Sequence, residues 1–542
     1  MRKNTELRVV SIAQSSGVEL NANLILDEKT TRIDQKLKTL SEYVQQYPSG
    51  WKKRLELAHL LYAIGRIEQA VEEYRQVMER QPQLIDVRLK LGKLLQLMGQ
   101  EAEAVAVYQS ALPLLRDRAT RQHIGGLIAI CQGDTERAIA AFESAASNEP
   151  HNSSHWLALG QVQMGREDGV AALRAFDAVL SLNPDDIVAS INSYDALMAV
   201  GNFRQAQQRL SKVLELAADD FRALKRQANN RCRMRLVSGE SGKQTKQIIS
   251  SALRLAPDAA DAHELLAYYH LLRGEWAKGV GVLAQFSEEH PNNSSGWYFY
   301  GRCLFHTGEY QKAADAMLKA YRLYPNDCQI YRALCEILPL TTPGAPLLQA
   351  EGGNTTLTSI VEEMLERFPQ RWSVWATAGR VLVESFEEIE RGCSACAKAT
   401  QLMPQLPDAW FSHGRVLALA GKHREAVEAL AQGWQLLPEN SGYLQSVSAA
   451  VWLAESYRVL GDDAASRRWW EEACQLAQEL MEFDPATANY WQARALEGLG
   501  DVTSAVEAYR SALSQQLLYP LRAEVESAVK RLKGKKRKGS HP

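Results

Sequence analysis

Proline recurs along this chain at a nearly fixed interval. The step is 34 residues from Pro48 to Pro82 and again from Pro150 to Pro184. Later prolines keep this interval or stay close to it: Pro257, Pro291, Pro325, Pro369, Pro404, Pro438, Pro485 and Pro520. A fixed period of this length is the signature of stacked supersecondary units. We therefore expect an array of repeats, which grows in one dimension instead of dividing into globular domains.

Each period carries the same set of residues at the same spacing. Trp156, Gly160, Ala172, Phe176 and Pro184 follow one another at steps of 4, 12, 4 and 8. The same steps give Trp297, Gly301, Ala313, Met317, Pro325 and Trp410, Gly414, Ala426, Leu430, Pro438. Residues four apart share one face of a helix, and a glycine interrupts the longer gap. The pattern predicts two antiparallel helices per unit, with the small residue of the first admitting the large residue of the second.

This set of residues resembles the tetratricopeptide repeat family, whose outline is W-x2-L-G, then A-x3-F, then P. The resemblance implies an all-α, right-handed superhelical solenoid of antiparallel helix pairs that binds proteins and is not an enzyme. We expect a half repeat and thirteen repeats over residues 33–520, a capping helix over 521–533 and a disordered basic tail over 534–542. Residues 1–32 break the rhythm and are expected to form an extended arm.

Three periods are longer than the rest, and they gain five, ten and thirteen residues before Pro257, Pro369 and Pro485. The first insertion carries a basic cluster, and the second is a predicted loop from Pro339 to Asn354. The third is expected to lengthen both helices of its pair, because 449–460 and 464–483 read as continuous amphipathic runs.

An arginine follows the packing glycine in three of the predicted first helices. In the resembled family this position faces the concave groove, as do the residue four before it and those three and four after it. The resemblance thus implies these partner-binding residues: Tyr298, Arg302, Phe305, His306, Arg380, Glu384, Phe411, Arg415 and, near the other end, His59 and Lys93. Guanidinium groups beside aromatic rings suit the carboxylates of a bound peptide. We expect a protein or peptide partner with acidic groups. The alternative is that each arginine only forms a salt bridge with a neighbouring repeat or stays solvated.

The formal net charge of −2 hides an uneven distribution. A basic cluster in 222–246 has a local charge of +7 and comprises Arg222, Lys225, Arg226, Arg231, Arg233, Arg235, Lys243 and Lys246. The segment 530–538 adds another +7, so the rest of the chain is acidic. An acidic body disfavours a nucleic-acid trough, which should be basic along its length. RNA association through the cluster and the tail is kept as an alternative, and the run Lys535–Lys538 would suit a nuclear address in a eukaryote.

Motifs for catalysis, cofactors and metals do not fit this chain. The segment 239–245 resembles a phosphate loop, but Val237 stands where glycine is required and Gln244 where serine or threonine is required. Cys393 and Cys396 form a CxxC without a second ligand pair, which favours helix packing over metal or redox chemistry. We expect no enzyme activity, no cofactor and no metal, and we expect the repeat tryptophans to pack between helices.

The sequence predicts a cytoplasmic protein. No stretch approaches the roughly 18 to 20 apolar residues of a membrane helix, and the first residues lack the apolar run of a signal peptide. The eight scattered cysteines suit reduced, buried thiols. The main functional hypothesis is a non-catalytic scaffold or adaptor. A second hypothesis is a regulatory or substrate-selecting subunit of an enzyme assembly, such as a glycosyltransferase, protease or nuclease effector.

Overall fold

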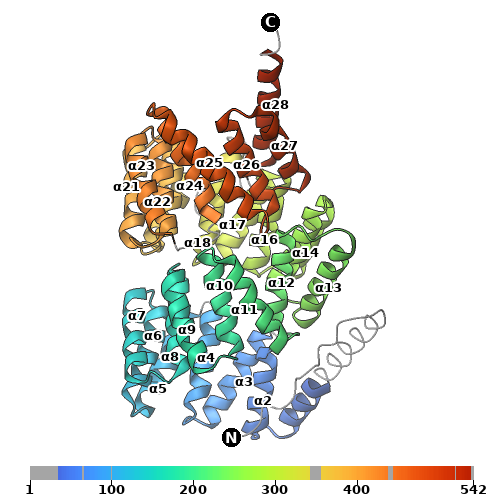
Figure 1. Cartoon of the computed structure of the whole chain (residues 1–542). Coiled ribbons are helices and arrows are strands. Elements are labelled where there is room, and N and C mark those ends of the chain that lie inside the picture. Colours follow the sequence, from blue (N-terminus) through green and yellow to red (C-terminus); the bar gives the residue numbers. More distant parts are fainter. Residues whose placement is uncertain are drawn as a thin grey trace. The chain divides into compact units, whose positions relative to one another are not determined.

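The computed structural model describes residues 35–63, 66–98, 100–341, 356–437, 444–518 and 520–538 (Figure 1). Over these ranges the regular structure is helical, without a β-strand. The predicted arm over 1–32, most of the predicted loop before Asn354 and the last four residues lie outside the described residues. The chain forms two compact units, and helices α10 to α13 contribute residues to both.

The first unit begins with helical residues 35–46 and continues with pairs of similar length. Its helices are α2 (Trp51–Ala63), α3 (Ile67–Arg80), α4 (Ile85–Leu97), α5 (Glu101–Ala111), η1 (Leu112–Leu114), α6 (Arg118–Cys131), α7 (Thr135–Asn148), α8 (Ser153–Gly165) and α9 (Gly169–Leu182). The four helices shared between the units are α10 (Ile187–Ala199), α11 (Phe203–Leu216), α12 (Phe221–Arg233) and α13 (Gly239–Leu255).

The second unit holds the remaining helices, drawn from green to red in Figure 1. They are α14 (Ala260–Leu272), α15 (Trp276–Glu289), α16 (Ser294–Thr307), α17 (Tyr310–Leu323), α18 (Cys328–Ile337), η2 (Leu338–Leu340), α19 (Leu357–Arg367), α20 (Trp372–Phe386), α21 (Ile389–Leu402), α22 (Pro407–Leu419), α23 (His423–Gln435), α24 (Leu444–Val459), α25 (Asp463–Leu480), α26 (Pro485–Leu499), α27 (Val502–Ser514) and α28 (Arg522–Lys538). From α2 to α9 and from α14 to α28, each helix packs against the next along the chain, as in α16 with α17 and α20 with α21, which confirms the predicted helix pairs there.

The packing glycines bring the two helices of a pair into close contact. A Cβ added to Gly160 would lie 2.3 Å from the ring of Phe176, and one added to Gly92 would lie 2.4 Å from the ring of Tyr108. Both rings are fully buried. The predicted pairing of a small residue with a large one is therefore confirmed, and only hydrogen fits at these glycines.

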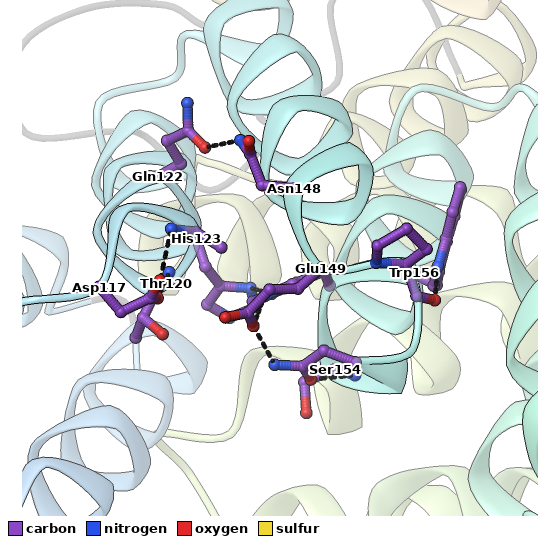
Figure 2. Close-up of polar contacts among 12 residues, drawn as sticks. Asp117, Thr120, Gln122, His123, Asn148, Glu149, Ser154 and Trp156 are labelled. Atoms are coloured by element: carbon purple, nitrogen blue, oxygen red, sulfur yellow. Dashed lines mark hydrogen bonds and ion pairs between the residues drawn. The ribbon is translucent and has the colours of Figure 1, made fainter.

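The repeat tryptophans join successive repeats by a recurring hydrogen bond. The indole N–H of Trp156 donates to the carbonyl oxygen of Pro150 over 2.9 Å. The same bond, six residues back along the chain, links Trp297, Trp375 and Trp410 to their prolines. In Figure 2 the ring of Trp156 lies beside the chain that enters α8. Proline thus ends one repeat, and its carbonyl fixes the first helix of the next.

Tight turns between the helices of a pair use residues with positive φ. Gly133, Gly308 and Gly421 have φ of 74°, 83° and 76°. Two repeats place glutamate at this turn instead, and Glu167 and Glu387 adopt φ of 68° and 57°. This left-handed region is unfavourable for residues with a Cβ, so tertiary packing holds these two turns.

The third insertion lengthens its helix pair as predicted, because α24 has 16 residues and α25 has 18. Two boundaries differ from the sequence prediction. Pro485 lies in the first turn of α26 instead of following the end of α25, since proline is tolerated where no amide hydrogen is needed. Helix α28 runs to Lys538, beyond the end predicted at 533, because residues 534–538 continue its helical turns.

We predict that Gly160→Ala destabilises the protein by about 1 to 3 kcal/mol, because the new methyl group overlaps the Phe176 ring. Gly165 in the same helix is the control, since an added Cβ there meets nothing within 4 Å. Gly165→Ala should be neutral or stabilising by up to about 1 kcal/mol. Denaturant unfolding followed by circular dichroism measures both, and equal effects would contradict the close-packing account.

Candidate partner-binding grooves

The first helices of the repeats line the inner face of the second unit. Helix α14 contacts α16, and the same contact recurs through α18, α20, α22 and α24 to α26. Because these helices approach one another more closely than the second helices do, they lie on the inside of the curve. We call their exposed surface the inner face.

The three arginines that the sequence singled out lie on this face and carry ion pairs. Arg302 donates to Glu336 over 2.7 Å, and Arg380 donates to Glu384 over 2.8 Å. Arg415 lies 3.8 Å from the other oxygen of Glu384. Each arginine side chain is about a third exposed, at 31%, 27% and 33%. These guanidinium groups are therefore accessible, and the chain itself supplies a carboxylate to each.

The sequence prediction included Glu384 but missed Glu336. Glu336 lies 34 residues after Arg302, so the repeat period was the signal that could have found this pair. Arg494 is bound in the same way by Glu455 and also donates to Tyr490 over 3.2 Å. Burial raises the pKa of Glu524 on α28, while Arg415 and Arg494 oppose that rise. The inner face is thus a run of paired charges, to which α28 adds a carboxylate.

The aromatic residues of the prediction have different placements. Tyr298 lies half-buried near Arg302, and burial raises its pKa. Phe305 and Phe411 are in the core at 4% and 2% exposure, which differs from the groove-facing position that the resemblance implied. The physical reason is that Phe411 fills the space above Gly433, and Phe305 packs with the buried residues of α17 and α18. Arg302 lies over the Phe305 ring at 5.4 Å and covers it from solvent.

The first unit presents Lys93 and His59 from neighbouring first helices. The Nζ of Lys90 lies 3.0 Å from Nε2 of His59. Lys93 keeps part of its side chain exposed. Burial of the rest, together with the nearby Arg222, lowers its pKa. The positive charges of Lys93 and Arg222 thus lie on one side of this unit, where Arg222 is paired with Asp220 at 2.8 Å.

Figure 2 shows a chain of polar side chains in helices α6 to α8 that the sequence did not predict. Nε2 of His155 lies 3.2 Å from Glu149, and Nδ1 of His155 lies 3.1 Å from Nδ1 of His123. The His123 ring packs edge-on against Phe142 at 5.1 Å. Burial lowers the pKa of His123 to about 4, helped by His155 and Lys93, so its ring is neutral at neutral pH. This network links two repeats through side-chain hydrogen bonds that end on the Glu149 carboxylate.

Most residues of the basic cluster are engaged within the chain. Lys225 pairs with Asp261, Arg231 donates to Thr245 over 2.9 Å, and Lys243 pairs with Glu240 over 3.0 Å. Arg233 lies 5.1 Å from the ring of Phe203. Arg235 donates to the carbonyl of Gln515 over 2.8 Å and lies 3.7 Å from Asp484. Arg226 is half-buried and Lys246 is exposed.

All eight cysteines are free thiols, of which six are buried and two, Cys131 and Cys474, are half-buried. Cys396 packs against Gly379, and a Cβ added to that glycine would lie 2.3 Å from the Cys396 sulfur. Cys396 therefore takes the packing position that aromatic rings take in other repeats. Burial raises the pKa of Cys396 to about 12, which leaves the thiol protonated. No helix within the described ranges has the length and apolarity that a bilayer crossing requires.

Stacked helix pairs with a small-to-large contact in each pair define a helical-repeat protein. Two sequence models described as tetratricopeptide repeat match the chain, one at residues 55–119, 126–187, 273–327 and 482–517 and the other at 164–228. The chain is a tetratricopeptide repeat protein.

Curated relatives match about a third of the chain. The peroxisomal targeting signal receptor of Pichia angusta is 25% identical over 184 residues, which are 32% of this chain and 32% of the receptor. The receptor of that name from Candida albicans is 24% identical over 196 residues, 35% of this chain and 32% of the receptor. Protein CTR9 homolog of Arabidopsis thaliana is 25% identical over 31% of this chain and 15% of its own length. The chain thus spans about a third or less of the length of these relatives.

Solved structures with similar helices cover more of the chain at lower identity. Yeast Tom70 is 16% identical, with 94% of this chain and 99% of that one covered and a TM-score of 0.36. The anaphase-promoting complex subunit assembly Cut9-Hcn1 gives 13% identity, 91% and 99% coverage and a TM-score of 0.34.

We predict that stability depends on pH through Glu264, a half-buried residue of α14. Burial and Asp261 raise the pKa of Glu264 from 4.5 to about 7, while Lys225 and Arg302 oppose the rise. The folded state therefore holds this proton more tightly than the unfolded chain, and the resulting stability is lost as the pH rises through 7. Glu264→Gln should leave the melting temperature at pH 4.5 nearly unchanged and add about 1 to 3 kcal/mol of stability at pH 8.

Thermal unfolding of both proteins at the two pH values measures this effect. Glu366→Gln is the control, because Glu366 is an exposed glutamate of the same unit. An equal gain for both variants at pH 8 would contradict the role given to Glu264.

Proposed function

We propose that this protein is a non-catalytic scaffold or adaptor that binds a peptide or protein partner along the inner face of its second unit. Membership of the tetratricopeptide repeat family supports a role in protein binding. Similarity to peroxisomal targeting signal receptors also supports the recognition of a protein signal. Each repeat adds a few side chains to one rigid surface, so the affinity for a partner accumulates along the array.

One observation carries the choice of the inner face. Arg302, Arg380 and Arg415 come from three first helices, all directly follow the packing glycine and are all about a third exposed. Their bonds to Glu336 and Glu384 are exposed ion pairs, which contribute only about 0 to 1 kcal/mol each. A carboxylate of a bound peptide can replace such a partner at little cost, with two parallel bonds to one guanidinium. An acidic segment in extended or helical form is therefore the proposed ligand.

Selection from a random peptide library on the full chain provides ligands for a direct test. We expect the selected peptides to be acidic and to bind Arg302→Ala/Arg380→Ala/Arg415→Ala at least about tenfold more weakly than the unaltered protein, since hydrogen bonds to charged groups contribute roughly 1.5 to 3 kcal/mol. Fluorescence anisotropy measures the affinity, and circular dichroism checks that the variant folds.

The matched control removes three arginines from second helices. Arg75, Arg391 and Arg467 also form ion pairs, at positions away from the inner face. Arg75→Ala/Arg391→Ala/Arg467→Ala should keep the affinity within about twofold, because exposed ion pairs contribute little. Exchange of the peptide's acidic residues for their amides should abolish the difference between the two triple variants. Equal binding by the two triple variants before that exchange would refute the inner-face site.

A further inference from the structure

The second unit contains a cavity of about 1000 Å³ beside the C-terminal ends of α14 and α16. One wall comes from α15 and the turn between α16 and α17, and the other comes from residues 516–518 and from residues 521–526 at the start of α28. Cavities of about 300 to 1000 Å³ are the usual size for ligand sites in proteins. Neither the arginine row nor the repeat pattern accounts for this cavity.

The wall formed by residues 516–518 and 521–526 is held in place by the rest of the unit. Arg235 donates to the carbonyl of Gln515 over 2.8 Å, and its side chain is only 11% exposed. Leu521 packs against the buried cluster of α16 to α20. Gln516 has a φ of 53°, a left-handed conformation that turns the chain at this point. The second wall of the cavity is thus held by contacts within the folded unit.

The lining is about half apolar and carries no unbalanced charge. Its large apolar and aromatic residues are Trp276, Val280, Phe305, Tyr310, Leu517 and Leu518. Its carboxylates are already paired, Glu309 with Lys312 over 2.6 Å and Glu526 with Arg522 over 2.9 Å. A neutral ligand with a large apolar body therefore fits these walls better than an ion does.

Two buried polar atoms lie in this lining without a hydrogen-bond partner among the described residues, Nδ1 of His306 and Oε1 of Gln516. Burial, with Arg302 nearby, lowers the pKa of His306 to about 3, so the ring stays neutral. The backbone of Leu518 raises that pKa, as expected when the other ring nitrogen donates to its carbonyl oxygen. Nδ1 is then a hydrogen-bond acceptor, as is the amide oxygen of Gln516. Buried acceptors without donors are uncommon, and both call for a donor on the ligand.

We propose that this cavity receives a neutral aromatic side chain with an N–H donor, the indole of a tryptophan in the partner peptide. The indole body lies against the apolar walls, and its N–H donates to Nδ1 of His306. A backbone N–H of the same peptide donates to Oε1 of Gln516. This assignment rests on the proposed function, because it gives the bound peptide a second anchor apart from the arginine row.

Two small probes isolate the donor on the full chain. 3-Methylindole is the tryptophan side chain, and 1,3-dimethylindole has the same body without the N–H. We expect 3-methylindole to bind about fivefold more tightly in ligand-detected NMR titrations, as one additional hydrogen bond implies. His306→Phe should remove that preference and leave the binding of 1,3-dimethylindole within about twofold.

Further variants keep the test independent of folding defects. Gln516→Met should weaken N-acetyl-tryptophanamide, which has backbone N–H groups, by about threefold to fivefold and leave 3-methylindole unaffected. Gln311→Met is the control, since Gln311 also has buried amide atoms without partners but does not line the cavity. The assignment is overturned if neither indole binds, if both bind equally to the unaltered protein, or if Gln311→Met matches Gln516→Met. Failure of the proposed function would appear separately, as an absence of selected peptides with the indole results unchanged.

Discussion

The close approach of two helices at a residue without a side chain is the contact on which this fold depends. At Gly160 and Gly126 the rings of Phe176 and Phe142 occupy the space that a Cβ would need. The buried ring supplies apolar area to the pair, and the glycine sets how closely the axes can approach. Because this contact of a small residue with a large one recurs from repeat to repeat, helix pairs of similar geometry follow one another at the interval seen in the sequence. The indole bond from Trp156 to the carbonyl of Pro150, repeated at Trp297, Trp375 and Trp410, then fixes these pairs to the ones before them.

Ion pairing along the inner face decides how the arginine row can act. A row of unpaired guanidinium groups would repel one another and attract any anion, whereas Glu336 and Glu384 offset most of the charge of this row while leaving it partly exposed. Under the proposed function, an acidic partner displaces one of these carboxylates with its own, and its selection depends on the spacing of its acidic groups more than on its total charge. The buried rings of Phe305 and Phe411 support this face from below.

The basic cluster has a structural use that its composition did not reveal. Arg235 belongs to the insertion before Pro257, yet its guanidinium binds the backbone of Gln515 and lies near Asp484. A cation that is 11% exposed and bound to the last repeats is not available to a nucleic acid. The same contact fixes the segment that closes the cavity lined by His306 and Gln516. The insertion before Pro257 thus helps to hold the last repeats of the second unit in place.

The sequence by itself determined the helix pairs, the glycine contacts, most of the proline boundaries and the family, because each follows from residues that are near in the chain and recur at one spacing. The lengthened pair α24 and α25 was predictable for the same reason. Only the tertiary structure decided which arginines are paired, that Phe305 and Phe411 are buried, and that Gln515 meets Arg235 from 280 residues away. Such contacts depend on how the repeats curve. Small rotations add up between one repeat and the next, and no single stretch of sequence records their sum.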